Sequence, residues 1–153
     1  MDSLKLFALD ADDLAVISAH VQDAVLKVSE MAYLPRDQRF VLICNRFDRS
    51  PPTPGAIPGP PQRRRAALRF ERVQKAQLQS IDLANRDTVL SLLALQFEPA
   101  SDPSAQPSGH VTLIFAGNAA VRLAVETIEL ALEDLGPAWA ASNAPSQIGR
   151  AHV

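Results

Sequence analysis

The 153-residue chain is poor in several residue types on which functional sites often depend. Cys44 is its only cysteine, which excludes an intrachain disulfide and a zinc site built from a cysteine cluster. Aromatic residues make up 5% of the chain, so few side chains are available to stack on nucleic-acid bases. The formal net charge is −2, so the molecule as a whole exerts no general attraction on nucleic acids or anionic lipids.

Long apolar runs and a secretion signal are also missing from the sequence. No stretch reaches the roughly 18–20 apolar residues that a membrane-spanning helix needs. The start, Met1-Asp2-Ser3, lacks the basic residues and the apolar segment of a signal peptide. We therefore expect a cytoplasmic protein without a membrane partner. Hydrophobic residues still make up 47% of the chain, which is enough for a packed core and excludes a wholly disordered protein.

Proline, in contrast, is abundant, and its clusters divide the sequence into blocks. Of the 12 prolines, six lie in a loop at 50–62 and three in a second loop at 98–109. Proline fixes φ and lacks an N–H group, so neither loop is expected to form helix or inner strand. We predict one α+β domain over 1–139 and a tail over 140–153. Loop 50–62 reads as a surface insertion between two strands, although its prolines also suit an aromatic-lined groove of a partner.

The last six residues, 148–153, match a known artificial DNA sequence when they are written as codons. The string ATC GGA AGA GCA CAC GTC, followed by the stop codon TGA, belongs to a common short-read sequencing adapter and encodes this hexapeptide. We therefore predict that 148–153 are a sequencing artefact, and we count His152 neither as a ligand nor as a base. Genomic DNA in which a natural reading frame ends in these codons would overturn this prediction.

Alternating apolar residues and turn signals predict a mainly antiparallel sheet. The stretches 24–34 and 39–47 flank a proline-containing turn and read as a hairpin whose second strand lies inside the sheet. The run 89–97 is almost continuously apolar, which favours a strand buried on both faces. Residues 63–82 favour a long strand with a bulge, but their spacing also suits a helical face. Altogether we expect about seven strands, at 4–9, 24–34, 39–47, 63–82, 89–97 and twice within 111–125.

Helices are predicted near both ends of this sheet. The first runs over 10–22, because Asp10 can cap its free N–H groups and an apolar stripe follows. The second runs over 127–135 and ends at Gly136. A closing helix after about seven strands is the element order of a pleckstrin-homology-like, partly open barrel, and an open curved sheet with two helices on one face is the alternative. The two apolar stripes are Leu14, Ile17 and Val21, and Ile128, Ala131, Leu132 and Leu135.

Several short blocks form a recognisable set in a fixed order along the chain. They include LKLFALD at 4–10, SAHVQDA at 18–24, ALRFERV at 67–73 and LGPAW at 135–139. Together these blocks resemble DUF2948, a family of unknown function found mainly in alphaproteobacteria, over nearly the whole chain to Trp139. The resemblance implies a small cytoplasmic protein, and it carries no activity or functional residue over to this chain.

Few residues are candidates for acid–base chemistry. His20 lies at the edge of the first apolar stripe and Asp23 follows three positions later, so a helix could place this imidazole beside a carboxylate. Glu126 is a second candidate carboxylate for His20. The structural alternative is a histidine at the boundary of the core, and His110 reads as a surface histidine at a strand start. The pattern predicts no metal site and no cofactor.

The most prominent charge feature is a group of six cations that we call the basic stripe. A stripe of this kind can bind the phosphate groups of RNA, of a nucleotide or of a lipid. The alternative is a solvated strand face whose arginines pair with carboxylates from elsewhere in the chain. Cys44 lies in the most apolar strand and reads as a buried, unreactive thiol. The basic stripe comprises Arg63, Arg64, Arg65, Arg69, Arg72 and Lys75.

The leading functional hypothesis from the sequence is a non-enzymatic binding or scaffold domain. It would contact a protein partner through a sheet edge or through the basic stripe, since the sequence contains no converging set of polar residues. One alternative is a small-metabolite enzyme or binding protein that uses His20 with Asp23 or Glu126. A second alternative is an RNA-associated factor that works through the basic stripe. The sequence leaves the activity, the ligand and the oligomeric state open.

Overall fold

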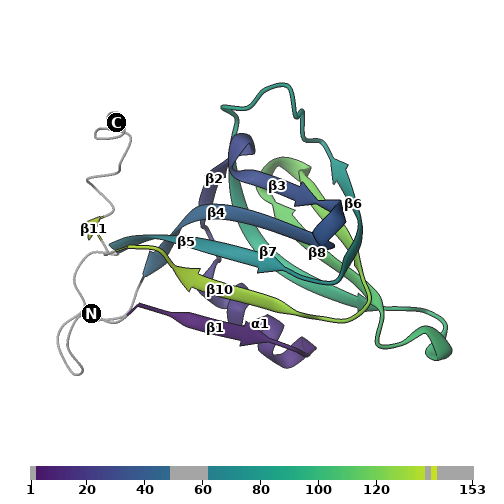
Figure 1. Ribbon diagram of the computed structural model, residues 1–153. Coiled ribbons are helices and arrows are strands. Elements are labelled where there is room, and N and C mark those ends of the chain that lie inside the picture. The colour runs from purple at the N-terminus through teal and green to yellow at the C-terminus, as the bar shows by residue number, and fades with distance from the viewer. Residues whose placement is uncertain (1–2, 49–61, 137–138, 141–153) are drawn as a thin grey trace.

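The computed structural model describes residues 3–48, 62–136 and 139–140, which form an open antiparallel sheet and one helix near the N-terminus (Figure 1). The helix is α1 (Ala11–His20), and the strands are β1 (Lys5–Ala8), β2 (Val25–Lys27), β3 (Met31–Leu34), β4 (Arg39–Asp48), β5 (Gln62–Phe70), β6 (Val73–Gln79), β7 (Val89–Pro99), β8 (Gly109–Phe115), β9 (Ala120–Val125), β10 (Leu130–Asp134) and β11 (Trp139–Ala140). The continuous path of the sheet is β1-β10-β5-β4-β2-β7-β8-β9-β6, while β3 pairs with β4 and β11 pairs with β5. No helix in the described ranges is long and apolar enough to cross a membrane.

Helix α1 forms where the sequence predicts it, because its start is stabilised locally. The Asp10 side chain accepts a hydrogen bond of 2.8 Å from the Asp13 N–H group, and the acidic first turn suits the positive end of the helix. Leu14 and Ile17 are buried against the core, as the apolar stripe indicates. The helix packs on β1 and β7, so it lies beside one edge strand of the sheet.

The predicted hairpins are confirmed. Strand β4 lies inside the sheet and pairs with β3 and β5, while a short 3-10 turn, η1 (Val28–Glu30), divides the predicted strand 24–34 into β2 and β3. Strands β8 and β9 are joined through a turn in which Gly117 has a φ of 77°, a left-handed conformation that favours glycine. Strands β4 and β5 pair down to Asp48 and Gln62, so the proline-rich loop does connect two paired strands. Residues 50–61 of this loop and residues 141–153 of the predicted tail lie outside the described residues.

The predicted long strand over 63–82 bends sharply and becomes β5 and β6. Arg72 lies between the two strands with a φ of 60°. Opposite this corner, β9 continues into β10, and backbone bonds from Glu71 to Glu129 (2.8 Å) and from Glu126 to Arg72 (3.1 Å) hold the two bent strands together. The predicted bulge is present in the ladder of β6 with β9, between Val73 and Lys75.

The predicted C-terminal helix is wrong, because its residues form strand β10 between β1 and β5. Leu130, Ala131 and Leu132 are consecutive and all buried, so the strand is covered on both faces. An inner strand of this kind shows no alternation, and its apolar residues fall by chance at helical spacing. The element order of a pleckstrin-homology-like barrel therefore lacks its closing helix in the described part of the chain.

The prediction that the run 89–97 is buried on both faces is also wrong. In β7, Leu90, Leu92 and Leu95 are buried, whereas Val89 and Leu93 are 62% and 42% exposed. The strand thus has one core face and one solvent face. Its sequence resembles that of a fully buried strand because apolar residues occupy part of its outer face.

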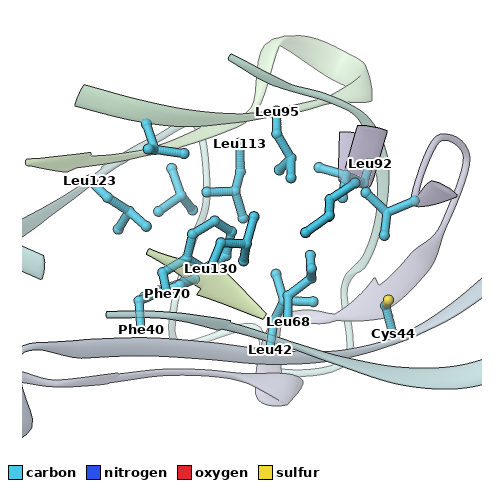
Figure 2. Packing of buried hydrophobic residues seen from close by; sticks show 14 of the residues in the cluster. Phe40, Leu42, Cys44, Leu68, Phe70, Leu92, Leu95, Leu113, Leu123 and Leu130 are labelled. Atoms are coloured by element: carbon cyan, nitrogen blue, oxygen red, sulfur yellow. The ribbon is translucent and has the colours of Figure 1, made fainter. Parts of the chain in front are cut away.

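The core lies on the inner face of the curved sheet and is built mainly from leucine and valine, with a few phenylalanines (Figure 2). The rings of Phe40 and Phe70 lie 6.2 Å apart, which is a favourable distance for a tilted aromatic pair. Leu42 and Leu68 are fully buried and lie opposite one another on β4 and β5. Further along the same two strands the inward side chains change from apolar to charged.

Candidate functional site

Four charged side chains are buried where the C-terminal ends of β4 and β10 lie beside the N-terminal end of β5. We call them the buried ionic cluster. Arg46 and Asp48 extend the inward positions of β4, where half-buried and buried side chains alternate. Arg64 takes the same place on β5, and Asp134 ends β10. All four are at most 8% exposed. Strand alternation therefore places these charges inside the protein, although their residue type is normally found outside.

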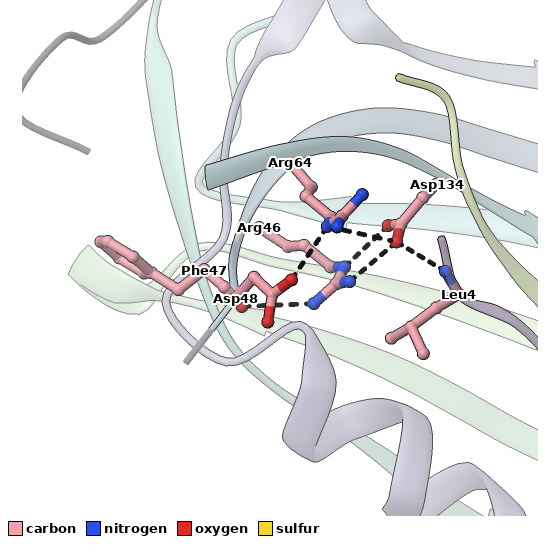
Figure 3. Close-up of polar contacts among 6 residues, drawn as sticks. All are labelled: Leu4, Arg46, Phe47, Asp48, Arg64 and Asp134. Carbon is pink, nitrogen blue, oxygen red and sulfur yellow. Dashed lines mark hydrogen bonds and ion pairs between the residues drawn. The ribbon is translucent and has the colours of Figure 1, made fainter. Parts of the chain in front are cut away.

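The Asp134 carboxylate is the centre of this cluster (Figure 3). It accepts two hydrogen bonds of 2.8 Å from Arg46, one from Nε to Oδ1 and one from Nη2 to Oδ2. The Leu4 N–H group donates to Oδ2 at 2.8 Å, and the Asp134 N–H group donates back to the Leu4 carbonyl at 3.0 Å. A single carboxylate thus connects β4, β10 and the residue before β1.

Arg64 forms the second half of the cluster. Its Nε donates to Asp48 Oδ2 at 2.9 Å and lies 3.9 Å from Asp134 Oδ2. Its Nη2 is buried and has no hydrogen-bond partner within the described residues. The two arginines and two aspartates cancel in formal charge, which makes their burial tolerable.

The structure divides the basic stripe into members with different surroundings. Arg64 points inward and is buried, so it is not part of a surface stripe. Arg65 donates to Glu30 at 2.6 Å, Arg69 donates to Glu71 at 2.8 Å, and Arg72 donates to Glu129 at 3.3 Å. Arg63 lies 3.8 Å from the centre of the Phe47 ring and donates to the Asn45 carbonyl, and Lys75 lies exposed on β6.

The candidate acid–base residues lie on two different parts of the molecule. His20 is half-buried in the last turn of α1, and Asp23 follows in a turn where its φ is 67° and its N–H group donates to the Leu92 carbonyl. Glu126 lies at the corner of β9 and β10, and β9 is two strands away from β7, on which α1 packs. His110 lies on β8 opposite Glu98 of β7. The described ranges hold no group of three or more His, Cys, Asp or Glu side chains suited to a metal ion.

Cys44 lies on the inner face of β4, and its surroundings make the thiol unreactive. The side chain is fully buried. This burial raises the pKa of the Cys44 thiol to about 12, and Arg46 opposes the shift only in part. The thiol is therefore neutral at physiological pH, which does not suit a nucleophile.

The outer edge of β6 is the second feature of functional interest, and we call it the β6 edge (Gln74–Gln79). Strand β6 ends the path of the sheet and, among the described strands, pairs with β9 alone. On its other side, the Val73 N–H group donates to the Gln38 carbonyl at 2.8 Å. Beyond that bond none of the described strands lies alongside β6, because the chain before Arg39 turns through η2 (Pro35–Asp37). Most side chains of the β6 edge are exposed: Gln74, Lys75, Gln77, Leu78 and Gln79.

Comparison with protein-family models matches residues 4–147 to DUF2948, a protein family of unknown function. The chain belongs to this family. The resemblance carried by the short sequence blocks is thereby confirmed, and the DUF2948 match extends beyond Trp139. No curated protein matches the chain, and no solved structure matches it either.

Sequence reasoning missed both the buried ionic cluster and the β6 edge of this DUF2948 chain. The cluster had one usable signal, since Arg46 and Asp48 follow the buried positions Leu42 and Cys44 at a spacing of two residues. The β6 edge had a weaker one, the run of polar residues after Val73. In neither case does the local sequence show which distant strand, if any, lies opposite.

Proposed function

We propose that this DUF2948 chain is a non-enzymatic binding module that recruits an extended, acidic protein segment to the β6 edge. One observation carries the proposal: within the described residues, no strand lies next to β6 beyond Arg39, the residue at which β4 begins. The recruited segment would add one strand to the sheet and continue the line of β4.

Backbone hydrogen bonding supplies the affinity in this proposal. An edge strand presents a row of N–H and C=O groups that an extended peptide can pair with, and alternate side chains of the peptide set its specificity. Strand β6 is seven residues long, which is sufficient for such pairing. The bond from Val73 to Gln38 closes one end of the β6 edge and so defines where the added strand stops.

Charge selects an acidic partner. Strand β6 contains Lys75 and no acidic residue. Arg72 precedes it, and the Arg72–Glu129 pair joins side chains that are 57% and 41% exposed, so this pair contributes little and can exchange its partner. Arg122 lies opposite Gln77 on β9 and thus on the same face as Lys75, and its contact of 3.7 Å with Glu98 is also between exposed side chains and can exchange its partner. A carboxylate-bearing segment would meet these cations beside the β6 edge.

The alternative functions draw less support from the geometry. An RNA-associated role needs a free cationic surface, whereas Arg64 is buried and Arg65 and Arg69 each contact a carboxylate. The comparison with a pleckstrin-homology-like barrel now depends on the curved sheet alone. We also propose a cytoplasmic location, which rests on the sequence only.

Two labelled peptides of about ten residues test the proposal. One alternates Val with Glu, the other alternates Val with Lys, and fluorescence anisotropy measures the binding of each to the full chain. We expect the acidic peptide to bind and the basic one not to bind. Lys75→Glu should weaken binding by about fivefold or more, because it replaces an attraction of roughly 1 kcal/mol with a repulsion.

Lys5→Glu is the matched control, since Lys5 is an exposed lysine on β1, the strand at the other end of the sheet path. This variant should bind the acidic peptide as tightly as the native chain does. Equal losses in both variants would mean that general electrostatics holds the peptide. No binding of the acidic peptide at low salt would refute recruitment at the β6 edge.

A further inference from the structure

A donor of the buried ionic cluster has no acceptor in the part of the chain that the structure describes. Arg64 is 1% exposed, and its Nε donates to Asp48, but its Nη2 has no hydrogen-bond partner among the described residues. Buried polar atoms of side chains are paired in the large majority of cases, and an exception calls for a specific cause. The guanidinium remains charged at any physiological pH, so the donor cannot be removed by deprotonation.

The charges around Arg64 decide which class of acceptor fits. The cluster is neutral, because two arginines balance two aspartates. Both oxygens of Asp134 already accept from Arg46, and Asp134 Oδ2 lies only 3.9 Å from Arg64 Nε. An added anion would bring a net negative charge into the interior beside two carboxylates. A neutral oxygen satisfies the donor without that cost.

The neighbouring inward positions are apolar, which limits the kind of acceptor that fits. Cys44 and Ala66 lie opposite one another on β4 and β5, next to the cluster, and both are fully buried. These side chains are small, and the layer beyond them is apolar. Leu42 and Leu68 in that layer offer no hydrogen bond, so a larger polar ligand would find no second partner there, and a single water molecule suits this place better.

We propose that Arg64 Nη2 marks a buried binding site for one water molecule, which completes the hydrogen bonding of the ionic cluster. The site is independent of the β6 edge, and its chemistry is that of a neutral acceptor held by a guanidinium donor. Because the cluster is already neutral, this site should favour water over chloride, phosphate or a carboxylate.

A crystal structure of the full chain grown in sodium bromide tests the proposal directly. We expect an oxygen peak at hydrogen-bond distance from Arg64 Nη2, about 2.7–3.2 Å, without anomalous signal at the bromine edge. An anomalous peak at this position would overturn the proposal in favour of an anion site. An Nη2 atom bonded to another group of the protein would overturn it as well.

Thermal unfolding supplies a second test in solution. The melting temperature of the native chain is measured in chloride, bromide and phosphate at constant ionic strength, with Arg64→Lys and the neighbouring Arg63→Lys as comparisons. We expect phosphate to raise the melting temperatures of all three proteins equally, because it is excluded from protein surfaces, and we expect no further anion-specific rise in the native chain. A rise with anion concentration that Arg64→Lys loses and Arg63→Lys keeps would contradict the proposal, since ligands that bind the native state stabilise it. If Arg64→Lys does not fold, the bromide structure decides the matter.

Discussion

Asp134 joins more elements than any other side chain of the buried ionic cluster. Its carboxylate bonds to Arg46 of β4 and to the Leu4 N–H group, while its own backbone continues β10. The two arginines near it, Arg46 and Arg64, come from different strands, and each lies at an inward position of its strand. Removing one member of such a buried set leaves its partners charged, buried and unpaired, which costs far more than the set contributes as a whole.

Asp134→Asn should therefore lower the free energy of unfolding by about 3–5 kcal/mol, because the Arg46 charge loses its counterion while the shape of the side chain is kept. Urea unfolding followed by circular dichroism measures this loss. Glu133→Gln is the matched control, since Glu133 is the exposed neighbour on the same strand. It should change the value by no more than about 0.5 kcal/mol. Equal effects of the two substitutions would contradict the structural role of Asp134.

Cys44 should behave as a protected thiol in the native chain. At about pH 8, a disulfide reagent should label it slowly in buffer and rapidly in urea, because the thiol is fully buried. Burial places its native pKa at about 12, above the ordinary value of 9.0. The unfolded chain therefore ionises first, so this group's contribution to stability is complete below pH 9.0 and is lost as the pH rises towards 12.

The stability difference between the native chain and Cys44→Ala should accordingly shrink as the pH rises through this window. Unfolding titrations of both proteins at the same pH values measure the difference, in which other titrating groups cancel. Rapid labelling in buffer, or a difference that grows with pH, would contradict a buried neutral thiol at this position.

At the scale of elements, the ladder between β7 and β8 depends on Gly109. A Cβ atom at this position would lie 2.7 Å from Cζ of Phe97 and would also collide with the Glu98 carbonyl oxygen. Gly109→Ala should thus lower the free energy of unfolding by about 1–3 kcal/mol, the usual cost of overpacking. Gly136→Ala is the control, because no atom lies within 4 Å of a Cβ built there. Thermal unfolding compares the two variants. A Gly109→Ala protein with an unchanged melting temperature would contradict this prediction, because it would show that β7 and β8 can move apart at little cost.

Helices and turns that are determined by residues close together in the chain could be predicted from the sequence. Asp10 caps α1 through a residue three positions away, and Gly117 provides the left-handed turn between β8 and β9. Strand β10 could not be predicted, because only its two neighbours, β1 and β5, explain why both of its faces are buried. The pairing of Arg46 with Asp134 likewise joins residues that are far apart in the chain, so no local pattern reveals it.

At the scale of the whole molecule, the sheet has two terminal strands of different character. Strand β1 has four residues, so the edge that it presents is short, and α1 packs beside it. Strand β6 has seven residues, and the chain before β4 turns away from it at Pro35–Asp37. Short or covered edges are the usual protection against unwanted strand pairing. The longer β6 edge is therefore the part of the sheet best suited to a partner strand.

Amide hydrogen exchange of the full chain, with and without the Val–Glu peptide, tests strand addition at the β6 edge most directly. We predict that alternate amides within Gln74–Gln79 exchange more slowly when the peptide is bound, because their N–H groups donate to its carbonyls. The amides of β1 should be unaffected. Unchanged exchange along β6 at saturating peptide, or protection that appears on β1 instead, would contradict the account.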